Sequence, residues 1–288
     1  MLLNCIITTY NRPVDIVKRA VNSALRQVNS TCEIEVVVVN DAPENTELSK
    51  RLEKEFSSMD SVRYISHEHN MGACAARNTG IRESTGEIIG FLDDDDEWLE
   101  NKIEVMIPYF SNQQVAIVYS DYLYRKDQEE PPIYMKRCSE EGNQFERILV
   151  SNYIGSTSLP LLRRSAVIDV GCFDEKIKSS QDHDLWIRLL EKYKAAYCPV
   201  PTIIYSFSEV SITTKKGNRT IGYNQLLEKY SRFYKKDRAL YHRRLNGIGR
   251  ALLRDKNYSE ALLYLLKAFL TDPLAADNYD YIIKHRRK

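Results

Sequence analysis

The sequence predicts an α/β protein with a largely parallel central sheet, followed by a small all-α extension. Short apolar runs alternate with amphipathic runs from the first residue, which is typical of βαβ units. Beyond about residue 211 only helical patterns remain. The 288 residues are enough for one extended α/β domain and an appendage. We therefore expect a domain at 1–210, with halves at 1–120 and 121–210, and a helical extension at 211–288.

The first half alternates between strands and helices. Four consecutive valines at 36–39 predict a buried strand. Pro13 suits the first turn of a helix, where its missing N–H is not needed. Gly72 opens a run of small residues with helical spacing. The expected strands are 2–7, 33–40, 62–66 and 88–92, and the expected helices are 14–27, 46–56 and 73–84.

The pattern loosens after about residue 115. Pro131 and Pro132 indicate a loop. Four polar residues, Gln181 to Asp184, precede a helix that we expect to begin at Leu185. The remaining expected strands are 115–119, 158–162, 195–198 and 203–206, and the remaining helices are 145–150 and 185–192.

The C-terminal extension contains one pattern of the tetratricopeptide type, between residues 245 and 273. A single repeat of this kind cannot bury its own apolar face. We therefore expect it either to dock on the α/β domain or to pair with a neighbouring molecule, which leaves a homo-oligomer open.

Charge is distributed unevenly between the two parts. The net charge is +1, but residues 1–210 carry −10 and residues 211–288 carry +11. A basic C-terminal segment favours an anionic partner, and a solvated helical surface is the plainer alternative. We expect it to allow peripheral contact with an anionic membrane, because each basic residue near such a surface adds about 1 kcal/mol.

Cysteine usage and the N-terminal segment indicate a cytoplasmic, soluble protein. The six cysteines are scattered and form no C-x-x-C pair, which is typical of small core residues in a reducing compartment. The N-terminal apolar run is too short for a signal peptide, and no stretch is long enough to span a membrane. The expected location is the cytoplasm, or the cytoplasmic face of a membrane.

Four consecutive aspartates, Asp93 to Asp96, end the apolar run that begins at Ile88. At a separation of about 6 Å and an effective dielectric near 20, each ionised pair repels by roughly 3 kcal/mol. A hard cation would neutralise this charge, and Mg²⁺ or Mn²⁺ is usually held by one or two carboxylates together with substrate phosphates. A calcium loop of the EF-hand type does not fit, because Trp98 occupies the position where that loop needs glycine.

Polar residues follow three of the expected strands. They are Thr8 to Asn11, then Asn40 and Asp41, then the four aspartates. In an open α/β sheet the ligand binds outside the carboxyl ends of the strands, so these segments should meet at one site.

The blocks that carry these residues resemble a known family. In order along the chain they are CIITTYNRP, VVVVNDAP, NMGACAARNTGI, TGEIIGFLDDDDEW and GCFDEKIKSSQDHDLWIRL. They are similar to those of family-two inverting glycosyltransferases, which have the GT-A fold, a Rossmann-like, mostly parallel sheet flanked by helices. The resemblance covers roughly residues 1–205, and five ordered blocks are more specific than any short motif.

The resemblance implies that the first half binds a nucleotide-diphosphate sugar, with a UDP-sugar expected. Thr8 and Tyr10 would surround the nucleobase, Asp41 would contact the base or ribose, and Arg77 would lie near the nucleotide. Two plainer alternatives stay open, a turn-forming role for Asp41 and a surface ion pair for Arg77.

Asp93 and Asp95 match the D-x-D element of the family. The resemblance implies that Asp95 binds Mn²⁺ or Mg²⁺ directly, and that Asp93 and Asp94 reach the ribose or metal-bound water. Asp93 is a second candidate metal ligand. We expect Asp96 to be solvated or to cap a helix. The metal would stabilise charge on the leaving nucleotide diphosphate.

Asp182 matches the family's general base, which takes the proton from the acceptor hydroxyl during attack with inversion. Gln181 replaces the usual glutamate before it, which leaves the role of that position open. A helix cap is the alternative for Asp182, and it is the favoured role for Asp184. His183 could orient the acceptor, although an exposed histidine without a role is the plainer interpretation.

Two aromatic residues and one missing motif bear on the acceptor. Trp98 and Trp186 could face a sugar ring, but core anchoring is more common. The Q-x-x-R-W element of processive synthases is absent. We therefore expect a metal-dependent, inverting, non-processive hexosyltransferase that adds one sugar to a hydroxyl of a glycan or lipid-linked oligosaccharide in surface-polysaccharide biosynthesis.

Two other classes of function remain open, and a third fits poorly. A sugar nucleotidyltransferase would want a glycine-rich phosphate loop after the first strand, which this chain lacks. A nucleotide-sugar-binding interaction protein would use the helical extension to recruit partners. Nucleic-acid processing fits poorly and no nucleic-acid partner is expected, because the positive charge lies in the C-terminal segment and not beside the aspartates.

Overall fold

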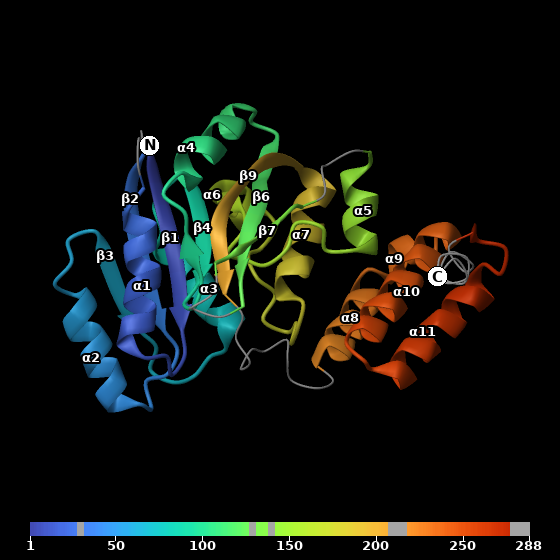
Figure 1. Cartoon of the computed structure of the whole chain (residues 1–288), viewed down its shortest axis with the longest axis horizontal. Coiled ribbons are helices and arrows are strands. Elements are labelled where there is room, and N and C mark those ends of the chain that lie inside the picture. Colours follow the sequence, from blue (N-terminus) through green and yellow to red (C-terminus); the bar gives the residue numbers. More distant parts are fainter. Residues whose placement is uncertain (28–31, 127–130, 138–141, 207–217, 277–288) are drawn as a thin grey trace. The chain divides into compact units, whose positions relative to one another are not determined.

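The computed structural model describes residues 1–27, 32–126, 131–137, 142–206 and 218–276. Internal contacts divide the chain into two compact units (Figure 1). Unit 1 comprises Met1–Glu141, Ile154–Lys176 and Gln181–Ser211, and unit 2 comprises Gly142–Tyr153, Ile177–Ser180 and Ile212–Lys288.

Unit 1 is built on a sheet whose strands follow the order β3-β2-β1-β4-β8-β6-β9-β5, with β7 paired to β6. The expected α/β fold is confirmed. β1, β2, β3 and β4 are mutually parallel, as are β6 and β9, whereas β8, β7 and β5 pair antiparallel with their neighbours. The sheet is therefore mixed in its second half. The strands are β1 (Leu2–Thr9), β2 (Glu33–Asn40), β3 (Val62–Ser66), β4 (Ile88–Asp93), β5 (Glu97–Trp98), β6 (Val115–Arg125), β7 (Ile133–Met135), β8 (Leu161–Arg163) and β9 (Lys194–Ser206).

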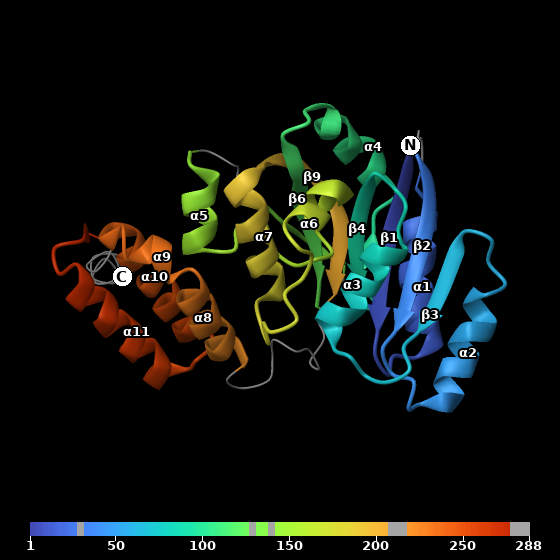
Figure 2. The same ribbon diagram turned by 180° about the vertical axis from the view of Figure 1, so that it is seen from behind.

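Helices cover both faces of this sheet. Figure 1 shows α1 in front of the parallel strands, and Figure 2, from behind, shows α3 on the opposite face. Unit 1 contains α1 (Val14–Leu25), α2 (Thr46–Phe56), α3 (Ala73–Glu83), α4 (Lys102–Met106), a 3₁₀ turn at Ile107–Ser111, α6 (Arg164–Asp169) and α7 (Gln181–Lys192). No helix among the described residues is both long enough and apolar enough to span a membrane.

Four sequence-based bounds in the second half are wrong. β6 continues to Arg125, beyond the strand expected at 115–119. α7 begins at Gln181 and not at Leu185, so the polar run is part of the helix. The two strands expected near 195–198 and 203–206 are one strand, β9. Its prolines, Pro199 and Pro201, lie where the pairing with β6 shifts register, a position that tolerates residues without an N–H. β8 covers only 161–163 of the region expected at 158–162.

Unit 2 is helical, with α5 (Gln144–Val150), α8 (Asn218–Lys229), α9 (Ser231–Tyr234), α10 (Arg238–Arg254) and α11 (Tyr258–Thr271). α10 and α11 pack on each other. A Cβ atom at Gly249 would lie 2.6 Å from Leu265 Cγ, so only glycine allows this close approach. The small core between the helices consists of Leu245, Ile248, Leu252, Ala261, Tyr264 and Ala268.

Lys102 is fully buried at the start of α4, and no carboxylate of the described residues forms an ion pair with its ammonium group. Its Nζ donates to the carbonyl of Leu159 at 2.7 Å and to Thr202 Oγ1 at 3.2 Å, and it lies 5.2 Å from the centre of the Trp98 ring. Burial lowers the pKa of Lys102 to about 7. Lys102 therefore holds the chain just after Ser158, next to the end of β4.

Replacing Lys102 by Met should change how stability depends on pH. The unfolded chain keeps the Lys102 proton up to about pH 10.5, whereas the folded protein loses it near pH 7. The unfolded state thus binds more protons in this window, and Lys102 makes stability rise with pH there. Between pH 7 and 10 we expect the free energy of unfolding of the wild type to rise relative to that of Lys102→Met. Urea denaturation at several pH values measures this difference. Both tryptophans lie in unit 1 and report on its unfolding.

The exposed Lys54 provides the control. Lys54→Met should run parallel to the wild type over the same pH range. Parallel curves for Lys102→Met would show that Lys102 does not titrate differently in the folded state.

Candidate active site

The carboxyl ends of β1, β2 and β4 lie side by side, as the sequence predicts. β1 pairs with β2 on one side and with β4 on the other, so Thr9 lies opposite Asn40 and Thr8 lies opposite Asp93. The polar residues that follow these strands therefore meet at one edge of the sheet.

The four aspartates at this edge have different surroundings. Asp94 is buried, accepts from Thr9 Oγ1 at 2.8 Å and pairs with Arg12 Nε at 3.0 Å. Burial outweighs Arg12 and raises the pKa of Asp94 to about 6. Asp96 is also buried and accepts from the backbone N–H of Ser206 at 2.9 Å. The expectation that Asp96 is solvated or caps a helix is wrong, because this contact turns its carboxylate into the protein.

Asp93 and Asp95 have the most accessible side chains of the four, 34% and 23% exposed. Asp93 Oδ1 accepts from Arg77 Nη2 and Thr157 Oγ1, each at 3.2 Å. Asp95 Oδ2 accepts from Arg12 Nη2 at 3.1 Å. Burial, followed by the charge of Asp93, raises the pKa of Asp95. The two carboxylates are close enough to repel each other and open enough to be reached.

This pair fits a cation that is completed by ligand phosphates. A divalent ion beside Asp93 and Asp95 would offset the repulsion that raises the pKa of Asp95. Among the described residues no group of three or more His, Cys, Asp or Glu side chains is arranged to hold a metal. One or two carboxylates with phosphate oxygens are the usual Mg²⁺ set, whereas a zinc or calcium site needs more protein ligands.

Arg77 joins this edge to the second half of unit 1. From α3 its Nη2 reaches Asp93, while its Nη1 donates to Gln181 Oε1 at 3.1 Å. Its guanidinium also lies 5.5 Å from the Phe173 ring. The ion pair of the plainer alternative is present, with Asp93, but the Arg77 side chain is only 13% exposed and so does not lie on the surface. A nucleotide contact for Arg77 stays a prediction.

The four polar residues in the first turn of α7 differ in burial. Gln181 and Asp182 are partly exposed, whereas His183 and Asp184 are buried. The cap expected at Asp184 is wrong, because Asp184 is the fourth residue of α7 and not the residue before it; its side chain pairs with Arg188 at 2.9 Å. Asp182 thus follows Gln181, the residue that contacts Arg77. This position agrees with the predicted role of Asp182 as general base, and that role stays a prediction.

Asp41 is buried and holds the segment that leads into α3. Its carboxylate accepts from the backbone N–H groups of Met71 and Gly72, each at 2.8 Å, and contacts His67 Nδ1 at 2.8 Å. His67 Nε2 in turn lies 2.9 Å from Thr79 Oγ1. Asp41 therefore orders the loop between β3 and α3, and its contact with a base or ribose stays a prediction.

The residues expected around a nucleobase lie at the end of β1. Thr8 is partly exposed, and the Tyr10 side chain is among the exposed aromatic ones, at 54%. Asn11 follows with a positive φ of 53°. An exposed aromatic ring can stack on a base, so the geometry allows the predicted role.

Sequence reasoning missed two residues at the site, Arg12 and His67, and one buried carboxylate elsewhere in unit 1, Asp121. Arg12 binds two of the aspartates, and its place directly after the polar end of β1 was the available signal. His67 had no such signal. Asp121, on β6, is fully buried and accepts from Tyr197 Oη at 2.6 Å, from the Arg137 N–H at 2.6 Å and from Tyr134 Oη.

Both tryptophans are core residues, so the alternative of core anchoring is confirmed. Trp98 packs against Gly90, where a Cβ atom would lie 2.6 Å from the ring. Trp186 is fully buried and donates to the carbonyl of Gly155 at 3.0 Å. Neither offers a face to a sugar.

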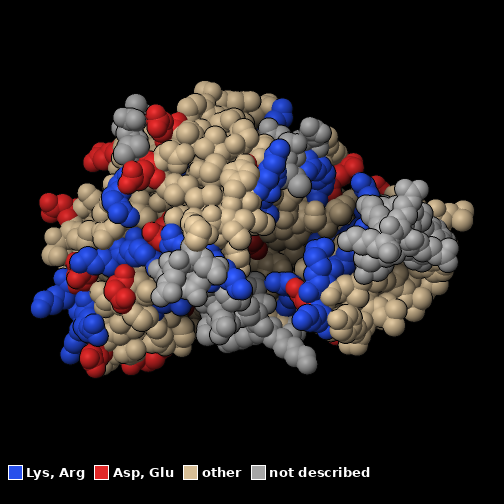
Figure 3. Space-filling model, viewed as in Figure 1, with Lys and Arg blue, Asp and Glu red and all other residues tan. Residues whose placement is uncertain are grey.

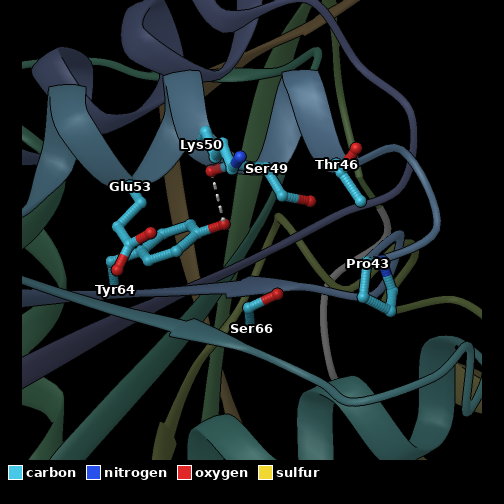
Figure 4. A pocket seen from close by; sticks show the side chains of 7 residues that line it. All are labelled: Pro43, Thr46, Ser49, Lys50, Glu53, Tyr64 and Ser66. Carbon is cyan, nitrogen blue, oxygen red and sulfur yellow. Dashed lines mark hydrogen bonds between the residues drawn. The ribbon is translucent and has the colours of Figure 1, made fainter.

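A separate hollow of about 300 Å³ lies between α2 and β3 (Figure 4). In it the Tyr64 hydroxyl donates to the carbonyl of Ser49 at 3.3 Å. None of the predicted site residues lines it. Its lining residues are Pro43, Thr46, Ser49, Lys50, Glu53, Tyr64 and Ser66.

Comparison with known proteins gives one family. The model described as "Glycosyl transferase family 2" matches residues 5–171. YwdF, an uncharacterized glycosyltransferase of Bacillus subtilis (strain 168), is 29% identical over 213 residues, which cover 73% of this chain and 75% of YwdF. The Escherichia coli UDP-Glc:alpha-D-GlcNAc-diphosphoundecaprenol beta-1,3-glucosyltransferase WfgD is 26% identical over 217 residues, 75% of this chain and 81% of WfgD.

One solved structure with the same fold is S. aureus TarS 1-349 in complex with UDP-GlcNAc. Its TM-score is 0.60 at 15% identity, over 99% of this chain and 92% of that one. At this identity the likeness concerns the fold alone.

Removing the imidazole of His67 should destabilise unit 1. His67→Ala leaves the buried Asp41 with one donor fewer, which should cost about 1–3 kcal/mol of the free energy of unfolding. His67→Asn keeps an N–H near the place of Nδ1 and should cost less. Urea denaturation followed by tryptophan fluorescence measures both.

The exposed His69, two residues further on, is the control. His69→Ala should change the free energy of unfolding by less than about 0.5 kcal/mol. Equal effects of His67→Ala and His69→Ala would contradict the structural role of His67.

Proposed function

This chain belongs to glycosyl transferase family 2 and is a glycosyltransferase, and from that membership we propose that it transfers one sugar, with inversion, from a nucleotide-diphosphate sugar to a hydroxyl group. The donor is a UDP-sugar, bound with Mn²⁺ or Mg²⁺. The acceptor is a glycan or a lipid-linked oligosaccharide of a surface polysaccharide, and the reaction takes place at the cytoplasmic face of a membrane.

One observation carries this proposal. Arg77 bridges Asp93, at the end of β4, and Gln181, the residue beside Asp182 at the start of α7. Arg77 therefore connects the carboxylates that could hold a metal with a diphosphate to the helix turn that contains the candidate base, Asp182.

The donor would bind across the ends of β1, β2 and β4. Tyr10 would stack on the base, and Thr8, Asp41 and Asp94 would surround the nucleoside. Asp95 and Asp93 would hold the cation, which when bound draws off negative charge from the leaving diphosphate. The names of TarS in complex with UDP-GlcNAc and of WfgD support uridine as the nucleoside.

Asp182 would take the proton of the acceptor hydroxyl. As that oxygen forms its bond to the anomeric carbon, the bond from this carbon to the diphosphate breaks on the opposite face, and the configuration inverts. Asp182 lies in the first turn of α7, where the helix dipole stabilises a carboxylate. The proton ends on Asp182, and the negative charge ends on the diphosphate.

Gln181 gives Arg77 a neutral partner. A glutamate there would compete with Asp93 for the guanidinium, because Arg77 contacts both residues. With glutamine, Asp93 is the one carboxylate that Arg77 contacts among the described residues, so no second carboxylate competes for the guanidinium.

The acceptor assignment is supported by the relative WfgD, whose name specifies a diphosphoundecaprenol-linked acceptor. An acceptor of that class resides in a membrane, which agrees with a basic C-terminal segment.

Replacing Asp182 by Asn should remove the base and leave the donor site intact. We expect kcat to fall by about 10²- to 10⁴-fold, while the dissociation constant for UDP with Mn²⁺ stays within about twofold. Glu191→Gln, on an exposed position of α7, is the control and should keep full activity. Normal turnover of Asp182→Asn would show that Asp182 is not the general base.

Removing the cation site should abolish both donor binding and transfer. Chelation by EDTA and the variant Asp95→Asn should each eliminate the rise in melting temperature that UDP with Mn²⁺ produces, because ligands stabilise the state that binds them. Glu100→Gln, at an exposed carboxylate shortly after the run, should behave as the wild type. Undiminished transfer in EDTA would exclude a metal-dependent mechanism, and pyrophosphate release from a nucleoside triphosphate would indicate a nucleotidyltransferase.

A further inference from the structure

α11 exposes an apolar surface that its packing on α10 does not use. The residues concerned are between 42% and 68% exposed. They are Tyr258, Leu262, Leu263, Leu266, Phe269 and Leu270, which we call the α11 apolar face. The buried side of the same helix is formed by Ala261, Tyr264 and Ala268. α11 is therefore apolar on both sides, whereas the outer side of a surface helix is normally polar.

The α11 apolar face is continuous. At 100° per residue, its members lie within one half of the helix circumference, centred on Leu266. Between Tyr258 and Leu270 they extend along about 18 Å of helix. Lys267 lies at one border of this face. An exposed apolar patch of this extent indicates a binding surface.

The helical segment that carries the α11 apolar face is basic overall. Residues 218–276 contain twelve Lys and Arg but five Asp and Glu. Arg254, Asp255 and Lys256 are exposed just before α11 begins, so two of these three charges are positive. In Figure 3, Lys and Arg side chains gather over α8 and α10, while the visible surface of α11 carries neither charge. Two copies of such a surface repel each other, whereas an anionic surface attracts it.

We propose that the α11 apolar face inserts into the interfacial region of an anionic lipid bilayer. The leucines and Phe269 enter the boundary between headgroups and acyl chains, and Tyr258 lies at the headgroup level. Lys267 at its border and the Lys and Arg side chains of the same helical segment contact anionic headgroups. An apolar helix face with flanking basic residues is the arrangement found in interfacial membrane helices.

This inference deepens the proposed function, because an enzyme held at a bilayer meets lipid-linked acceptors there. Its test needs no substrate. Hydrolysis of the donor in solution reports on the active site separately, so the failure of one proposal is distinguishable from the failure of the other.

The full-length protein should bind vesicles of phosphatidylcholine with about one third phosphatidylglycerol. We expect Leu262→Ser/Leu266→Ser to lower the partition coefficient in a flotation assay by about tenfold or more, since two large apolar side chains leave the bilayer. Binding of the wild type should weaken on neutral vesicles. It should also persist in part at about 1 M salt, where electrostatic attraction is screened.

The control is Ile133→Ser/Ile168→Ser, which removes two comparably exposed apolar residues from unit 1. This variant should bind vesicles as the wild type does. Leu262→Ser/Leu266→Ser should keep the wild-type melting temperature and donor hydrolysis, because both leucines are exposed.

A reporter at the surface gives a second readout. Both native tryptophans are buried, so a tryptophan introduced by Leu266→Trp adds an exposed fluorophore. Its emission should shift to the blue and be quenched by brominated lipid on vesicle binding.

Three results would overturn the inference. One is unchanged vesicle binding by Leu262→Ser/Leu266→Ser. Another is emission from Leu266→Trp that vesicles do not alter. The third is conversion of a dimer to a monomer by the leucine substitutions, seen by light scattering, since the α11 apolar face would then bind a second copy.

Discussion

Crowding of negative charge at the end of β4 is the constraint on which the site depends. Four consecutive carboxylates lie where a buried strand leaves the sheet, and two of them, Asp94 and Asp96, are themselves buried. At about 4 Å and an effective dielectric near 20, one charge pair is worth about 4 kcal/mol. Such a run persists in a folded protein only where positive groups or hydrogen-bond donors surround it.

The protein supplies those groups from distant segments. Arg12 comes from the loop after β1, Arg77 from α3, and the Ser206 N–H from the end of β9. Each contact draws a separate part of the chain to the end of β4. The contacts that stabilise the aspartates are therefore also the contacts that assemble the site, and Arg77 extends them to Gln181.

Much of the fold could be predicted from local patterns. The bounds of β2, α2 and β3 agree with the sequence. Two of these elements have a strong local signal: the valine run in β2, and Asn45 before α2, whose side chain accepts from the Leu48 N–H. The antiparallel pairings of β8, β7 and β5 depend on contacts between distant residues, which a single sequence does not reveal. The start of α7 was misjudged, although Asp184 and Arg188 have the spacing of a helical ion pair.

The candidate site also has features that could be predicted from the sequence and features that could not. The meeting of the strand ends follows from parallel pairing and could be predicted. Which aspartate is buried could not, because that depends on Arg12 and Ser206, more than 80 residues from their partners. In the proposed function the open pair, Asp93 and Asp95, binds a cation together with a nucleotide diphosphate. The anomalous scattering of Mn²⁺ in a crystal grown with UDP tests it most directly. We expect a manganese peak at Asp95, beside the diphosphate of UDP. Bound UDP with no metal at Asp95 or Asp93 would show that these carboxylates do not hold the cation.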